Sequence, residues 1–253
     1  MNSNSWKAIF DKYSIHKHNF NKEPFLISAE QIKQATSHFK KTNEKEVRIL
    51  CKQDTREDRP DVFIENNVFL LPTKNGYYAI VKGEGYIDIP EIKSSAKIYT
   101  SKLDFKLDTS EIGNSEMQHL DFAYASSLVR TFMNDDTLVL TIRGRKYTPQ
   151  FSFMVGKQKI SVESVQTEVD AGYEGKNQVV LIEAKNSKTN NTIIRQLFYP
   201  FRQWSHHTNK TVKTLFFEKR SNFYSLWQFD FSDINDYNSI RLSKSQKFEI
   251  IEK

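Results

Sequence analysis

The chain has 253 residues, and its 38% hydrophobic content is enough to fill one large core or two modest ones. No run approaches the roughly 18 consecutive apolar residues that a membrane-spanning helix needs. The first residues, MNSNSWKAIF, lack the charged region and apolar stretch of a signal peptide. A single cysteine, Cys51, excludes an internal disulfide and a CxxC zinc site. We therefore expect a globular, cytoplasmic protein that contacts no membrane.

The charge is basic and unevenly distributed. Lys and Arg number 37 against 31 Asp and Glu, which gives a net charge of +6 and a pI of about 9.1. This balance fits a protein that binds a polyanion. Residues 186–224 carry a single acid, Glu218, and the bases Lys188, Arg195, Arg202, Lys210, Lys213, Lys219 and Arg220. A solvated basic face is the alternative interpretation of this tract.

Residues 1–105 predict a small α+β domain. A short helix opens it, and a second helix is expected to begin at Ser28, because Ser28 and Gln31 have the spacing of a capping box. Three β-like runs follow, EVRILCK (46–52), NNVFLLP (66–72) and GYYAIVKG (76–83). Residues 96–114 are polar and read as a connector. A DNA-recognition role and a purely structural role for this domain both stay open.

Residues 106–253 predict a second, larger domain with a mixed α/β fold, in which helices flank a central mixed sheet. Helices are expected at 115–133 and 191–204, and Pro200 should kink or end the second of them, leaving 201–204 as a separate turn. Strands are expected at 137–144, 151–155, 159–170, 178–185, 211–220, 222–231 and 247–251.

The hairpin VQTEVDAGYEGKNQVVLIEAKNS (165–187) has a register that follows from its loop. If the loop is centred on Lys176 and Asn177, Asp170 lies opposite Glu183. Because side chains alternate along a strand, one face should be charged and the other apolar. The charged face is predicted to carry Gln166, Glu168, Asp170, Glu183 and Lys185, and the apolar face Val169, Ile182 and Ala184.

Two opposed acids at about 5 Å repel each other unless a cation lies between them. Mg²⁺ suits this position, because it takes one or two protein carboxylates, here Asp170 and Glu183, with the carbonyl of Ala184 as a further oxygen. Lys185 is placed to orient an attacking water. The alternative is an ordinary hairpin in which Glu168 and Lys185 form a surface ion pair that contributes about 0–1 kcal/mol.

The segments GRKYTPQFSF (144–153), QTEVDAGYEG (166–175), VVLIEAKNS (179–187) and IRQLFYPFRQW (194–204) together resemble the catalytic region of PD-(D/E)XK nucleases, and more narrowly of type II restriction endonucleases. The resemblance covers roughly residues 112–205 and implies Mg²⁺-dependent hydrolysis of double-stranded DNA at a short specific sequence. Asp170 and Glu183 match the metal-binding acids and Lys185 the motif lysine. Val169 stands where the family motif has proline.

The resemblance also implies roles for residues outside the motif. Gln196 matches a polar residue that the following helix directs towards the active site, although a partly exposed helix glutamine is the alternative. Glu116 corresponds to an acid that sometimes joins the site, and otherwise it stabilises a helix N-terminus. Glu174 is a further candidate.

Candidate DNA contacts come from the basic residues near the motif. Arg143, Arg145 and Lys146 in IRGRKY, and Lys188, Arg195 and Arg202 beyond it, could bind phosphates or read bases. No Walker motif is present, so no nucleotide cofactor is expected. Cutting both strands of a palindrome favours a homodimer. The alternatives are a repair or junction-resolving nuclease of the same fold and a non-catalytic DNA-binding protein.

Overall fold

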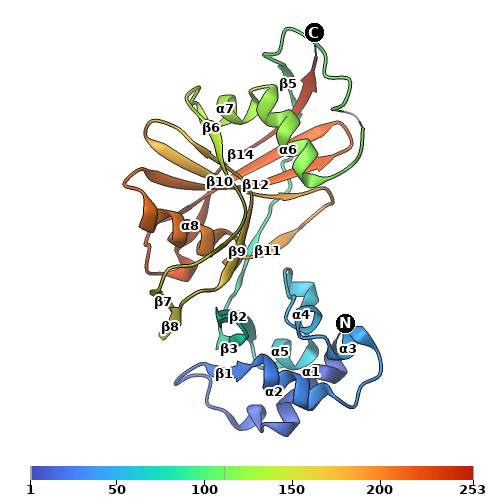
Figure 1. The fold of residues 1–253 in the computed structure, drawn as a ribbon, viewed down its shortest axis with the longest axis vertical. Helices are drawn as coiled ribbons and strands as arrows, with labels where there is room; N and C mark the ends of the chain where they lie inside the picture. The colour runs from blue at the N-terminus through green and yellow to red at the C-terminus, as the bar shows by residue number, and fades with distance from the viewer. Residues whose placement is uncertain (1, 111, 253) are drawn as a thin grey trace.

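A seven-stranded mixed sheet forms the upper part of the computed structural model, which describes residues 2–110 and 112–252 (Figure 1). Its strands, in spatial order, are β5 (Lys97–Thr100), β14 (Ile240–Ile251), β13 (Phe223–Phe231), β12 (Thr211–Arg220), β10 (Gln178–Lys185), β9 (Gln166–Glu174) and β6 (Val139–Tyr147). The pairs β10/β12 and β14/β5 are parallel and the other neighbours are antiparallel. The predicted mixed α/β fold with a central mixed sheet and helices is confirmed.

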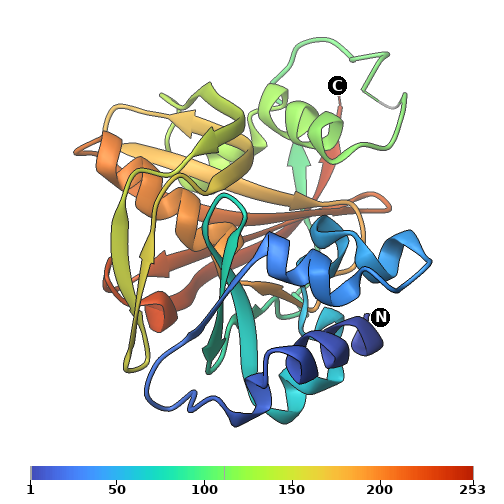
Figure 2. The same ribbon diagram turned by 60° about the horizontal axis from the view of Figure 1, so that its bottom comes forward.

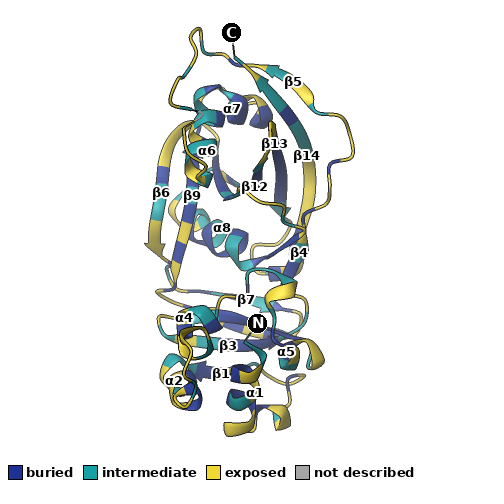
Figure 3. Cartoon of the chain, turned by 90° about the vertical axis from the view of Figure 1, so that its right-hand side faces the viewer, coloured by how far each residue is buried: buried dark blue, intermediate teal, exposed yellow. Residues whose placement is uncertain are grey.

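Helices cover both faces of this sheet. On one face, α6 (Glu116–Ala125) and α7 (Leu128–Met133) place Leu120 and Val129 in a core with Ala171 and Ile182. On the other face, α8 (Arg195–His207) packs against β9, β10 and β12. The inner strand β12 is therefore largely buried, whereas β14 carries long exposed stretches (Figure 3).

Two predicted helices differ from the structure. The helix expected over 115–133 is broken between α6 and α7, because Ser127 adopts a left-handed backbone conformation with φ of 66°. The helix expected over 191–204 starts later, because residues 191–193 form the short strand β11 (Asn191–Ile193), which pairs with β4 (Tyr86–Asp88).

Pro200 neither ends α8 nor detaches residues 201–204, and the expectation of a separate turn is wrong. The helix continues to His207. Pro200 is the sixth of the thirteen residues of α8, where it cannot donate a main-chain hydrogen bond to the Gln196 carbonyl, and the packing of its neighbours holds the helix together. Leu197 and Phe198 are buried in the core, and Phe201 packs against it.

Residues 3–82 form what we call the N-terminal module. Its elements are α1 (Ser3–Lys12), η1 (Ile15–Lys17), β1 (Phe25–Ser28), α2 (Ala29–Thr36), α3 (Thr42–Lys45), α4 (Val47–Leu50), η2 (Arg56–Asp58), α5 (Asp61–Glu65), β2 (Val68–Lys74) and β3 (Tyr77–Lys82). The predicted capping box of Ser28 and Gln31 is present at the start of α2. The three strands form an antiparallel sheet in the order β1-β3-β2.

The strand expected over 46–52 is instead the helix α4. Val47 and Leu50 are buried three residues apart, which is a helical and not a strand spacing, and Trp6 Nε1 donates to Leu50 O at 3.0 Å. The polar connector expected over 96–114 contains β5, which pairs with β14 at the end of the central sheet. The C-terminal strand is also longer than expected, because β14 starts at Ile240.

A separate hairpin of β7 (Phe151–Val155) and β8 (Gln158–Val162) precedes β9. The expected continuous strand over 159–170 is interrupted because Ser164 has a positive φ of 52°. The last short helix, η3 (Tyr237–Ser239), leads into β14.

The N-terminal module shares a core with the rest of the chain. Along β2, Val68 and Leu70 face the helices of the module, whereas Phe69 and Leu71 pack with residues of the second part. Figure 2 shows the β2–β3 hairpin beside α8, where Tyr199 Oη donates to Pro72 O at 2.9 Å. Within the described residues, no helix is long and apolar enough to cross a membrane.

Candidate active site

The β9–β10 hairpin has the register that its loop predicted. Val179 lies opposite Glu174, and Ile182 lies opposite Ala171, while the Gly175 N–H donates to Gln178 O at 2.8 Å across the turn. The paired ladder ends at Ala171 and Ile182. Asp170 and Glu183 therefore stand at the point where the two strands separate.

A β-bulge lies at Asp170. On the neighbouring strand β6, Ile142 pairs with Gly172 and Gly144 with Val169, so two steps along β6 match three along β9. The extra residue falls at 170–171. Bulges of this kind bend a strand and redirect a side chain, and they are common beside active sites.

The bulge overturns part of the predicted face pattern. Val169 packs with Leu181 on the α8 side of the sheet, whereas Ile182 and Ala184 pack on the α6 side. The expectation that these apolar residues share one face is therefore wrong. Regular alternation fails here because the extra residue in β9 shifts the side-chain phase by one position.

The two strands and the start of α8 enclose a cavity of about 440 Å³, which we call the acidic cavity. It brings together six of the residues predicted from the sequence, from four elements or their ends. Its lining consists of Asp54, Glu116, Gln166, Thr167, Glu168, Asp170, Glu183, Lys185, Arg195, Gln196, Tyr199 and Pro200.

Glu183 and Lys185 form a tight pair in this cavity. Lys185 Nζ donates to Glu183 Oε1 at 2.5 Å and to Ala184 O at 3.0 Å. Burial raises the pKa of the Glu183 carboxyl to about 7, against the opposing effect of Lys185. Burial alone would lower the pKa of the Lys185 ammonium, but the Glu183 carboxylate outweighs it and raises that pKa.

Asp170 is anchored to the opposite strand by its carboxylate. Its Oδ2 accepts the main-chain N–H of Ala184 at 2.8 Å. Burial raises the pKa of Asp170, although this hydrogen bond and the nearby Lys185 act against the rise. The ion pair between Glu168 and Lys185 that the alternative interpretation requires is absent, since Glu168 pairs with Arg145 at 3.3 Å and Lys185 with Glu183.

Gln196, in the first turn of α8, lines the same cavity. Thr192 Oγ1 donates to Gln196 Oε1 at 2.6 Å, and Thr192 itself is buried. This contact fixes the orientation of the amide. Glu116, at the start of α6, lines the cavity as well.

The remaining candidates lie outside the cavity lining. Arg143 pairs with Asp121, Glu174 with Lys210, and Arg145 with Glu168 at the rim of the cavity. Lys146 is exposed on β6, and Lys188 borders a different hollow beside Glu218. Arg202 donates to Ser152 O and Asn235 Oδ1. The DNA contacts proposed for these basic residues, and the site role proposed for Glu174, stay predictions.

Asp54 is a charged residue of the cavity that the sequence does not predict. It comes from the N-terminal module, far along the chain from the motif, and it forms an ion pair with Arg195 at 3.7 Å. The charged run KQDTREDRPD (52–61) was visible in the sequence. Nothing in one sequence connects that run to α8, because the contact depends on the tertiary fold.

The donor set in the cavity suits a hard cation. Within residues 2–110 and 112–252, no group of three or more His, Cys, Asp and Glu side chains could hold a metal ion. The oxygens assigned to the metal are the carboxylates of Asp170 and Glu183 and the carbonyl of Ala184, and Asp54, Glu116 and Glu168 add further carboxylates to the lining. Mg²⁺ usually binds one or two protein carboxylates and completes its shell with waters and phosphate, so these groups fit it.

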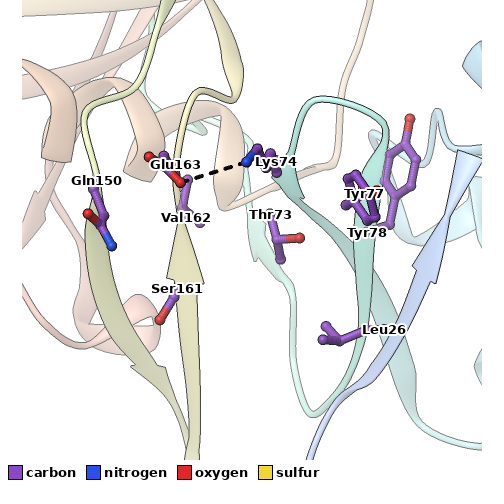
Figure 4. Close-up of a pocket in the computed structure, with 9 residues that line it drawn as sticks. All are labelled: Leu26, Thr73, Lys74, Tyr77, Tyr78, Gln150, Ser161, Val162 and Glu163. Carbon is purple, nitrogen blue, oxygen red and sulfur yellow. Dashed lines mark ion pairs between the residues drawn. The ribbon is translucent and has the colours of Figure 1, made fainter.

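A second hollow of about 340 Å³ lies between the β2–β3 and β7–β8 hairpins (Figure 4). Figure 4 shows Lys74 and Glu163 joined across it, with an Nζ to Oε2 distance of 4.0 Å. Glu163 is its one acid, and Leu26 and Tyr77 are exposed at its edge. It lacks the paired carboxylates of the acidic cavity, which is the stronger candidate for chemistry.

Comparison with known protein families identifies two matching profiles. The profile described as "Domain of unknown function (DUF6997)" matches residues 81–249, which is most of the chain. The chain belongs to the DUF6997 family. A second profile, "Domain of unknown function (DUF6996)", matches residues 3–80. No curated protein and no solved structure matches the chain.

The two profiles of this DUF6997 member meet within strand β3, and β4 and β5 already pair with strands of the second part. The division at residue 105 stays a prediction. Neither profile description states an activity, so a functional assignment rests on the acidic cavity.

Proposed function

We propose that the protein is a Mg²⁺-dependent endonuclease of the PD-(D/E)XK type, specifically a type II restriction endonuclease. It would hydrolyse phosphodiester bonds of double-stranded DNA at a short specific sequence. The observation that supports this most is that Asp170, Glu183 and Lys185 border one cavity at the end of the β9–β10 ladder. A central mixed sheet flanked by helices is compatible with a restriction-endonuclease-like core.

The contacts of Lys185 support a cation-binding role for the cavity. Its ammonium already rests against Glu183 Oε1 and Ala184 O, which are two of the three groups assigned to the metal. These oxygens thus already face one positive charge. When bound by Asp170, Glu183 and Ala184, Mg²⁺ would polarise the phosphodiester and neutralise negative charge that develops during hydrolysis.

The side chains have separable roles in this proposal. Because the pKa of Lys185 is raised, its ammonium stays protonated at neutral pH and serves as a hydrogen-bond donor and positive charge, not as a proton acceptor. It can therefore orient a water or stabilise the charge that forms on the phosphate. Gln196, whose Oε1 is engaged by Thr192, presents its amide N–H groups to an oxygen in the cavity.

The partners follow from the same proposal. Double-stranded DNA is the substrate, and the basic net charge favours its binding. Cutting both strands of a palindromic site is simplest with two active sites related by a twofold axis, so we expect a homodimer. A restriction role is compatible with the cytoplasmic location expected from the sequence.

Digestion of a long linear DNA in Mg²⁺ tests the proposal. A restriction endonuclease produces a reproducible set of discrete fragments with defined ends. Cleavage confined to branched or damaged DNA would contradict it and favour a junction-resolving or repair nuclease. Salt-sensitive binding of DNA with no cleavage in Mg²⁺ would favour a non-catalytic DNA-binding protein.

A further inference from the structure

A loop of the N-terminal module reaches the acidic cavity. Residues 52–59 leave α4, pass through η2 and place the Asp54 carboxylate in the cavity lining. The acid lies beside α8, whose first residue is Arg195, and Asp54 Oδ1 is 3.7 Å from Arg195 Nη2. One charged residue of the cavity lining therefore comes from the part of the chain that contains none of the motif residues.

Hydrogen bonds fix this loop to the strand that precedes α8. The Ile193 N–H donates to Asp54 O at 2.8 Å, and the Arg56 N–H donates to Asn191 Oδ1 at 2.7 Å. Asn191 Nδ2 in turn donates to both carboxylate oxygens of Glu57, at 3.1 and 3.0 Å. Because β11 leads directly into α8, the loop and the first turn of the helix form one rigid unit.

Arg195 lines the cavity, and among the described residues its guanidinium makes an ion pair with Asp54 but no hydrogen bond. Its side chain is 24% exposed. Arg202, on the same helix, instead donates to the oxygens of Ser152 and Asn235. At 3.7 Å, the contact between Asp54 and Arg195 is an ion pair that is too long for a hydrogen bond. It can orient the guanidinium while leaving its N–H groups free to donate to another ligand.

We propose that Asp54 is a positioning residue that holds Arg195 towards the acidic cavity, where Arg195 binds a phosphate of the DNA backbone. This inference rests on the proposed function and extends it. An arginine fork matches two phosphate oxygens, and a fixed orientation removes part of the entropy cost of that contact. The N-terminal module thereby completes the phosphate-binding site, whether or not it also reads bases.

A double-mutant cycle on DNA affinity tests this coupling without requiring cleavage. Wild type, Asp54→Asn, Arg195→Gln and the double variant are titrated with a fluorescent duplex of about 30 base pairs, with Ca²⁺ in place of Mg²⁺. We expect Arg195→Gln to weaken DNA binding about tenfold. The slope of log K against log salt concentration should fall by the amount expected for about one phosphate contact. In the Asp54→Asn background we expect the same change to cost only about twofold, because Arg195 has lost its orientation.

The cycle separates positioning from simple charge neutralisation. Removal of Asp54 also removes its direct repulsion of DNA, but that effect is present with and without Arg195 and cancels in the cycle. If Asp54 only neutralised the charge of Arg195, the coupling would have the opposite sign. Arg195→Gln would then weaken DNA binding more in the Asp54→Asn background than in wild type. That result, or equal effects in both backgrounds, would overturn the proposal.

Matched controls keep the result interpretable. Asp88→Asn removes another acid from the same junction, one that pairs with Arg56 outside the cavity lining, and it should show no coupling to Arg195. Asp54→Asn keeps the main-chain acceptor of Ile193, so the loop should remain in place. If that variant does not fold, Asp54→Glu replaces it in the cycle, with reduced coupling expected from the displaced carboxylate.

The outcomes for the two proposals are distinct. Coupling of Asp54 and Arg195 with no DNA cleavage by wild type in Mg²⁺ would preserve the phosphate site and refute the nuclease. Cleavage without coupling would refute the role of Asp54 and leave the nuclease standing. With both present, Asp54→Asn should lower kcat about tenfold or more, and this loss should vanish in the Arg195→Gln background.

Discussion

The Asp170 carboxylate accepts the main-chain N–H of Ala184 at 2.8 Å, immediately beyond the last paired residues of the β9–β10 ladder. The side chain takes the place of the next backbone hydrogen bond between the strands. It thereby ties one candidate metal ligand to the residue next to the other, Glu183. The geometry of the site thus depends on the same contact that closes the ladder.

Asp170→Asn and Asp170→Ala should separate this structural role from metal binding. Asparagine keeps an oxygen that can accept the Ala184 N–H, so we expect little change in the free energy of unfolding. Alanine leaves that N–H without its partner and should cost about 1–3 kcal/mol. Both variants should lose Mg²⁺ binding, measured by calorimetry. Equal stability of the two variants would contradict the structural role of the hydrogen bond to Ala184. Retained Mg²⁺ affinity in either variant would contradict the role of Asp170 as a metal ligand.

Glu183→Gln should make stability less dependent on pH. Burial raises the pKa of Glu183 from 4.5 to about 7, so the folded protein holds this proton more tightly than the unfolded chain does. Its stabilising contribution is therefore fully present below about pH 4.5 and is lost as the pH rises through about 7. Relative to the variant, metal-free wild type should lose about 3 kcal/mol of unfolding free energy between pH 4.5 and 8.

Urea unfolding in EDTA at several pH values measures this difference, and Mg²⁺ provides the control. Because a metal ligand must be deprotonated, Mg²⁺ should stabilise wild type more at pH 8 than at pH 5.5 and should leave the glutamine variant unchanged. Parallel pH profiles for the two proteins would show that the Glu183 proton is not retained on folding.

Arg202→Ala should act on stability more than on DNA affinity. Arg202 lies over the ring of Phe151, 4.8 Å from its centre, and donates to Ser152 O and Asn235 Oδ1. We expect a loss of about 1–3 kcal/mol in unfolding free energy. The salt dependence of DNA binding should stay as in wild type. A slope reduced by one phosphate contact would instead support the DNA contact predicted from the sequence.

Cys51 should be inert in the folded protein. Burial raises the pKa of its thiol to about 12, against a smaller opposing effect of Tyr78, so almost no thiolate is present at pH 8. Iodoacetamide should leave Cys51 unmodified in native buffer and alkylate it fully in urea, as read by mass spectrometry. Rapid alkylation of the native protein would contradict the packing of Cys51 against the core of the N-terminal module.

The register of the motif hairpin was predictable because it depends on local sequence. A short loop fixes which residues of β9 and β10 face each other, and the turn at Lys176 and Asn177 is marked by its neighbouring glycine and polar residues. The gathering of Asp170, Glu183 and Lys185 follows from that register. Gln196 joins them because α8 follows the motif strand closely in the chain.

The bulge at Asp170 and the contribution of Asp54 were not predictable in this way. The extra residue in β9 is defined by its pairing with β6, which the β7–β8 hairpin separates from it in sequence. Asp54 lies in the cavity lining because hydrogen bonds from its loop to Asn191 and Ile193 hold that loop beside the start of α8. Both features depend on contacts between segments that are distant in the chain.

Mg²⁺-dependent cleavage by Lys185→Ala, compared with wild type and Lys213→Ala, tests the nuclease assignment most directly. Lys213 is a matched control, because it pairs with Asp230 at 3.1 Å on the adjacent strand and is buried to a similar extent, 28% against 25% exposed. The assignment predicts discrete fragments from wild type and Lys213→Ala, and a loss of at least about 100-fold in rate for a folded Lys185→Ala. Unchanged cutting by Lys185→Ala would contradict it.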